Sequence, residues 1–123
     1  MTHMLTIECV TVDCHNPARV ADFWAEVLDW EVTQASDTDV VVEPRNRGLV
    51  LSPVLLFLKA PDTKVIKNRL HFDLRPDNQA VEVARAEALG ATRVEIGQSA
   101  DPATTWVVMA DPEGNEFCIL RAL

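Results

Sequence analysis

The hydrophobic pattern of residues 11–32 returns at residues 71–94, so the chain repeats itself after about half its length. Each segment opens with an apolar-rich strand that contains an aspartate, Asp13 or Asp73. Each then passes through a short polar turn into an amphipathic helix, a leucine and further β-prone residues. The repeat predicts two modules built in the same way.

The first predicted helix begins after Asn16, a favourable N-cap, with Pro17 at its first position. Apolar residues then recur at the spacing of one helical face. They are Val20, Phe23, Trp24, Val27 and Leu28. This stripe predicts that the helix packs on a sheet, with Trp24 in the core.

The second predicted helix starts near Asp77 or Asn78, and Gly90 ends it as a C′ residue. The face predicted to pack carries smaller residues than the first helix does. It consists of Val81, Ala84, Ala88 and Leu89. A stripe of small residues predicts a close approach to the sheet.

Three β-prone segments follow each helix. After the first come residues 30–35, 40–44 and 49–60, and after the second come 91–96, 104–110 and 116–123. The last two are joined by Asp-Pro-x-Gly at 111–114, which favours a type I turn. Each half therefore reads β-α-β-β-β, whereas a ferredoxin-like repeat would leave strands unused.

The pattern predicts an α+β fold of two tandem βαβββ modules within one domain, residues 1–123. Module one covers residues 1–60, a polar linker covers 61–68, and module two covers 69–123.

Composition places the chain among soluble proteins, with 48% apolar and 24% charged residues. The longest apolar run, residues 54–58, is far shorter than the roughly 18 residues of a membrane span. No signal-peptide pattern opens the sequence. Cys9, Cys14 and Cys118 form no CxxC pair, which argues against a disulfide framework. We therefore expect a cytoplasmic protein in which each thiol is buried and free.

The net charge of −8 argues against binding to nucleic acids or anionic membranes. Residues 45–69 nevertheless hold six basic residues and one acid, a local charge of +5. This segment is either a solvated surface or a local attraction for an anionic small molecule.

Three stretches resemble the vicinal oxygen chelate superfamily, which includes glyoxalase I, bleomycin-resistance proteins and extradiol dioxygenases. "NPARVADFWAEVLDWEV" resembles its first helix, "KNRLHFDLRPDNQAVEVARAEALGATRV" the start of its second module, and "DPEGNEFCIL" its final hairpin. The chain is most similar to small bacterial glyoxalase-like proteins. The resemblance implies curled mixed sheets around a cup that holds the site, and a homodimer.

The resemblance also implies four positions for the ligands of a divalent metal ion. They fall on Cys9, on Leu56 or Leu58, on His71 and on Cys118. Of these only His71 is a residue that the superfamily commonly uses there, and Cys118 stands where a carboxylate is expected. The usual site for a hard cation is therefore not expected, and neither is glyoxalase I activity.

One hypothesis is a protein that binds a small molecule in the cup and needs no metal or other cofactor. The ligand would be anionic or aromatic, Lys67 and Arg69 could hold an acidic group at the rim, and Trp106 either stacks on the ligand or packs in the core. The residues predicted to line the site are Cys9, Thr11, Asp13, Arg69, His71, Asp73, Trp106 and Cys118.

The alternative hypothesis is an enzyme with a changed metal site. Cys9, His71 and Cys118 would form a zinc site with an open fourth position. Such a site would suit a lyase, hydrolase or dioxygenase that acts on a small carbonyl or anionic substrate. Without a metal, His71 could act as a general base.

Overall fold

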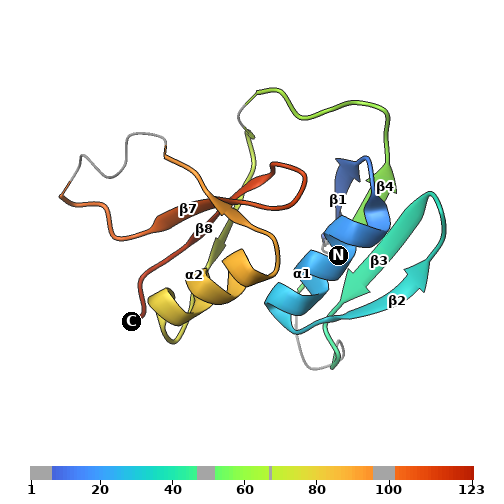
Figure 1. Cartoon of the computed structure of the whole chain (residues 1–123). Coiled ribbons are helices and arrows are strands. Elements are labelled where there is room, and N and C mark those ends of the chain that lie inside the picture. Colours follow the sequence, from blue (N-terminus) through green and yellow to red (C-terminus); the bar gives the residue numbers. More distant parts are fainter. Residues whose placement is uncertain (1–6, 47–51, 67, 96–101) are drawn as a thin grey trace, which may run out of the picture. The chain divides into compact units, whose positions relative to one another are not determined.

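The computed structural model describes residues 7–46, 52–66, 68–95 and 102–123, in two compact units, residues 1–63 and 64–123 (Figure 1). The first unit contains β1 (Cys9–Cys14), α1 (Pro17–Leu28), β2 (Glu31–Ala35), β3 (Asp39–Glu43) and β4 (Val54–Lys59). The second contains β5 (Phe72–Leu74), α2 (Gln79–Ala88), β6 (Thr92–Arg93), β7 (Val107–Ala110) and β8 (Glu116–Ile119). The predicted α+β fold of two βαβββ modules is confirmed.

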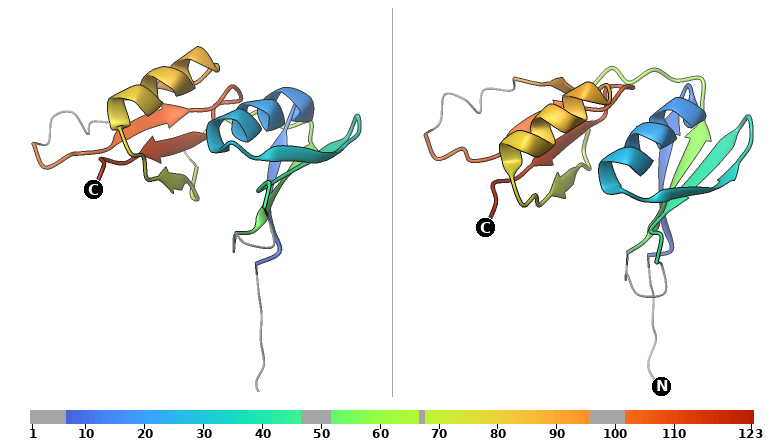
Figure 2. Two further views of the ribbon diagram at one scale, coloured as in Figure 1. Left: turned by 90° about the horizontal axis from the view of Figure 1, so that it is seen from below. Right: turned by 60° about the horizontal axis from the view of Figure 1, so that its bottom comes forward.

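Both units contain a four-stranded mixed sheet, and neither sheet is closed. The strand orders are β1-β4-β3-β2 and β5-β8-β7-β6, so the first strand of each module pairs with its last strand. Those two pairings are parallel and the others are antiparallel. In each unit the helix lies across one face of its own sheet (Figure 2).

Helix α1 begins and packs as its sequence predicts. The Asn16 side chain accepts a hydrogen bond from the Arg19 amide at 3.2 Å, and Pro17 occupies the first turn. Trp24 is only 3% exposed. The predicted cap and the predicted core position of Trp24 are both confirmed.

The ends of α2 also agree with the prediction. Asn78 caps the helix through a 3.2 Å bond from the Val81 amide to its side-chain oxygen. Gly90 follows the helix with φ of +116°, a conformation that residues with a side chain rarely adopt. These two residues fix where the helix begins and ends.

The prediction of which face of α2 packs on the sheet was wrong. Val83 and Ala86 are the buried residues, whereas Val81 is 56% exposed. The Gln79 side chain donates a 3.0 Å hydrogen bond to the Ile119 carbonyl, which places positions 79, 83 and 86 on the sheet side. All four residues of the predicted stripe are exposed or half-buried, namely Val81, Ala84, Ala88 and Leu89. Small apolar residues occur on both faces, so the hydrophobic pattern alone fits two orientations.

The strands are shorter than the sequence pattern predicts. Leu70 is 85% exposed, because the pairing of β5 with β8 starts only at Phe72. Trp106 likewise precedes β7. The predicted strand residues 49–51 and 96 lie outside the described residues.

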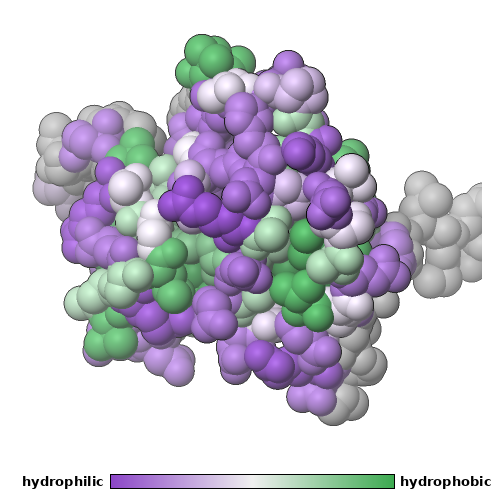
Figure 3. Space-filling model, turned by 45° about the vertical axis from the view of Figure 1, so that its right-hand side comes forward, coloured by the Kyte–Doolittle hydropathy of each residue, from purple (hydrophilic) through white to green (hydrophobic). Residues whose placement is uncertain are grey.

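Hydrophobic residues on the face drawn in Figure 3 form several small groups among hydrophilic ones. Scattered exposure of this kind is ordinary for a folded domain. Neither helix in the described part of the chain is long and apolar enough to cross a bilayer.

The orientation of α2 gives a direct test with two similar valines. Val83→Ala removes two methyl groups from a side chain that is 1% exposed, so we expect a loss of about 2 kcal/mol in the free energy of unfolding. Val81→Ala is the matched control, and its expected change is within about 0.5 kcal/mol. Urea denaturation measures both, and a larger loss at position 81 would contradict the orientation.

Candidate functional site

The register between β5 and β8 creates the face on which the candidate site lies. Cys118 of β8 has two direct partners, Asp73 on β5 and Val108 on β7. Side chains of paired neighbours point to the same face of a sheet. His71 stands two residues before Asp73, and alternation brings it to this face as well.

The opposite face of the same sheet is the one that α2 covers. Phe117 and Met109 are paired across β8 and β7, and both are 0% exposed. Because Phe117 lies between Glu116 and Cys118, its burial against the helix forces both neighbours onto the site face.

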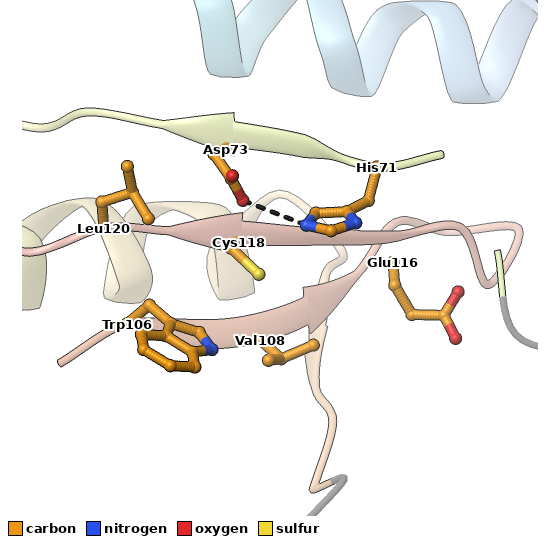
Figure 4. A pocket seen from close by; sticks show the side chains of 7 residues that line it. All are labelled: His71, Asp73, Trp106, Val108, Glu116, Cys118 and Leu120. Carbon is orange, nitrogen blue, oxygen red and sulfur yellow. Dashed lines mark ion pairs between the residues drawn. The ribbon is translucent and has the colours of Figure 1, made fainter. Parts of the chain in front are cut away.

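A pocket of about 360 Å³ occupies the site face of the second sheet (Figure 4). Its volume lies within the range of small-molecule sites. The lining residues are His71, Asp73, Trp106, Val108, Glu116, Cys118 and Leu120. Figure 4 shows the polar side chains coming from the β5 side and from β8, with Trp106 and Val108 on the β7 side. The pocket therefore has one wall with polar groups and one apolar wall.

The imidazole of His71 and the carboxylate of Asp73 face each other within the pocket. The His71 Nε2 and Asp73 Oδ1 atoms are 3.2 Å apart, and the side chains are 41% and 53% exposed. Pairs this exposed contribute only about 0–1 kcal/mol to stability. The fold therefore depends little on this pair, which leaves both groups available to a ligand.

Glu116 is held by the segment that leads into the second module. Its carboxylate lies 3.1 Å from the Lys64 ammonium and accepts a 3.3 Å hydrogen bond from the Asn68 amide. Burial by itself raises the pKa of Glu116, but the bonds from Lys64 and the two backbone amides outweigh it and leave this pKa below its usual value. Glu116 is therefore an ionised carboxylate in the pocket wall whose negative charge is balanced by the Lys64 ammonium.

Three donor groups in the pocket could hold a metal ion. One donor atom each from His71, Asp73 and Cys118 lies within 4.8 Å of the other two. Cys118 is 7% exposed, so its sulfur lies at the base of the group. Imidazole, carboxylate and thiolate together suit zinc better than magnesium or calcium.

The structure brings together four of the residues that the sequence predicts for the site. His71, Asp73, Trp106 and Cys118 all line the pocket. Arg69 is exposed and is not among the lining residues, and Lys67 lies outside the described residues.

The three predicted site residues of the first module lie on one face of β1. Cys9, Thr11 and Asp13 are exposed, so Cys9 is not the buried thiol that its sequence context predicts, whereas Cys14 and Cys118 are buried. Their partners on β4 are Val54, Leu56 and Leu58, which carry no metal-binding atoms. The role of Cys9 as a zinc ligand stays a prediction.

Sequence reasoning missed Glu116, Val108 and Leu120 as parts of the pocket. The signal for two of them was available, because residues 116, 118 and 120 alternate along one strand. The partnership of Glu116 with Lys64 had no such signal, since 52 positions separate the two residues.

The glyoxalase-like domain family model matches residues 9–120 of this chain. The chain belongs to this family, and with it to the vicinal oxygen chelate superfamily. No curated protein matches the chain significantly.

Solved structures confirm the fold at low sequence identity. A glyoxalase/bleomycin resistance protein/dioxygenase family enzyme from Burkholderia phytofirmans PsJN is 20% identical, with a TM-score of 0.72, and covers 97% of this chain and 100% of its own. TnmS3, an antibiotic-binding protein from Streptomyces sp. CB03234, is 16% identical, with a TM-score of 0.65, and covers 98% of each chain. The glyoxalase I of Leishmania major is 13% identical, with a TM-score of 0.66, and covers 96% of this chain and 87% of its own.

The Lys64–Glu116 pair predicts a specific pH dependence of stability. Because the folded-state pKa of Glu116 is lowered, its stabilising effect is fully present above the usual glutamate pKa and is lost as the pH falls through the folded-state value. At pH 7, Glu116→Gln should lower the free energy of unfolding by about 1–2 kcal/mol.

Urea denaturation of both proteins from pH 7 to pH 3 measures this difference, which should shrink in acid. In a Lys64→Met background, Glu116→Gln should change the free energy of unfolding at pH 7 much less than it does in the unmodified protein. An effect of Glu116→Gln that is the same at every pH would contradict this role of the carboxylate.

Proposed function

We propose that the second module binds a small, largely apolar molecule in the pocket on the face of β5, β8 and β7. The observation that carries this proposal is the pocket itself, about 360 Å³, with an apolar wall and a few polar groups on one side. Ligand sites in proteins commonly combine an apolar lining with a small number of polar groups that fix orientation.

The groups in the pocket favour a planar ligand over a strongly anionic one. Trp106 is 40% exposed, so its ring can still gain contact area when a ligand binds. The carboxylates of Asp73 and Glu116 also line the pocket, and the ammonium of Lys64 already pairs with Glu116. Of the two predicted ligand classes, aromatic and anionic, the aromatic class therefore fits this wall better.

One structural neighbour is named as an antibiotic-binding protein. At 16% identity this likeness extends to the fold, and it supports the view that this fold can serve to bind a small molecule. The predicted homodimer and cytoplasmic location stay predictions.

A second candidate function is a metal-dependent lyase, hydrolase or dioxygenase. The observation that favours it is the group formed by His71, Asp73 and Cys118. A bound zinc ion would supply Lewis-acid chemistry, and His71 and Asp73 would hold it at the polar wall.

Fluorescent probes test the binding proposal. N-phenyl-1-naphthylamine, which is neutral and aromatic, should bind saturably, and more tightly than the anionic 1-anilinonaphthalene-8-sulfonate. Trp106→Ala should cost about 1 kcal/mol of stacking energy, or roughly a fivefold higher Kd. Val81→Ala, on the exposed face of α2, is the control and should bind as the unmodified protein does. Failure of both probes to saturate would count against the pocket.

The residues at the expected ligand positions predict that the protein lacks glyoxalase I activity. Three of the four ligand positions that the resemblance implies for glyoxalase I carry other residues, namely Cys9, Leu56 or Leu58, and Cys118. We expect no S-lactoylglutathione from methylglyoxal and glutathione with added zinc, nickel or magnesium. Turnover that depends on added metal would show that other residues supply the ligands.

A further inference from the structure

The donor atoms on the polar wall of the pocket are arranged differently from those that the superfamily resemblance implies. The implied set takes ligands from both modules and favours carboxylate and imidazole. Here His71, Asp73 and Cys118 all belong to the second module. Asp73 and Cys118 are partners on β5 and β8, and His71 immediately precedes β5. Asp73 is not one of the implied ligand positions, and Cys118 offers sulfur in place of oxygen.

The present spacing is close to that of a tetrahedral zinc site. With ordinary zinc–ligand bond lengths, an imidazole nitrogen and a carboxylate oxygen are about 3.3 Å apart, and a thiolate sulfur is about 3.6 Å from either. The observed distance from Nε2 to Oδ1 is 3.2 Å, and no pair among the three donor atoms exceeds 4.8 Å. Small rotations of the side chains would close the difference.

Burial and neighbouring groups also suit a cation. The sulfur of Cys118 lies at the base of the group, and the two exposed side chains can turn toward it without disturbing the core. Lys64, whose ammonium would repel a metal ion, is paired with Glu116 at 3.1 Å. The wall thus offers a carboxylate, an imidazole and a thiol that becomes an anionic donor when it loses its proton.

We propose that His71, Asp73 and Cys118 bind one thiophilic divalent cation, zinc in the first place, within the second module. The Cys118 thiol releases its proton to solvent when the metal binds, so affinity rises with pH. The fourth position of the tetrahedron opens into the pocket. This metal site does not rest on the proposed small-molecule function, because the metal alone can be tested.

Cobalt(II) is a suitable probe, because a thiolate bound to it gives a charge-transfer band in the near ultraviolet and tetrahedral geometry gives intense visible bands. Protein freed of its affinity tag and of metal is titrated with cobalt(II), and zinc is then added in competition. We expect about one cobalt ion per chain with both sets of bands, and displacement by zinc.

Variants assign the donors. Cys118→Ser should abolish the charge-transfer band, and Asp73→Asn should raise the cobalt Kd at least tenfold. Asp77→Asn, an exposed aspartate before α2, is the matched control and should leave binding unchanged. Asp73 is 53% exposed, so its variant is expected to fold even if Cys118→Ser does not, and circular dichroism checks both.

The site is overturned if no charge-transfer band forms, if the band survives in Cys118→Ser, or if Asp73→Asn binds cobalt normally. Cys9→Ser separates the two possible ligand sets. Unchanged cobalt bands in this variant support the site proposed here, and their loss would replace it with the set of Cys9, His71 and Cys118.

Discussion

The parallel pairing of β5 with β8 is the constraint on which the second module depends. It places Asp73 beside Cys118 and Phe72 beside Phe117, so that one face of the sheet carries donor groups and the other packs under α2. A shift by one residue would bury the carboxylate and expose the phenylalanines. Burial of Phe117, at 0% exposure, is therefore what holds the thiol in the pocket.

Four further contacts tie the edges of the pocket to this core. The Gln79 amide bonds to the carbonyls of Thr105 and Ile119, which fixes the backbone beside Trp106 and at the end of β8. Lys64 and Asn68 attach the incoming segment to Glu116 at the other end of that strand. The polar pair of His71 and Asp73 has no comparable anchoring role, because both groups remain largely exposed. Stability and ligand recognition are thus assigned to different faces of the same strands.

Local signals in the sequence predicted the elements well, because caps and periodicity act over a few residues. Asn16, Asn78 and Gly90 mark helix ends by backbone hydrogen bonding and conformation, which a single sequence displays. The orientation of α2 was predicted wrongly, because it depends on a hydrogen bond from the Gln79 side chain to the Ile119 carbonyl, 40 positions away in the sequence. The same holds for Glu116, whose charge is fixed by a distant lysine. The grouping of His71 with Cys118 was anticipated through the family resemblance, and Asp73 was predicted to line the same site. That Asp73 lies directly opposite Cys118 follows from the strand register, which the sequence did not show.

The register of β5 against β8 can be measured directly by the backbone nuclear Overhauser effects between the two strands in isotope-labelled protein. The structure predicts contacts that link Asp73 with Cys118 and Phe72 with Phe117. Loss of both contacts, with Phe72 and Cys118 as direct partners in their place, would show a register shifted by one residue. In that case the thiol would face α2 and the pocket as described would not exist.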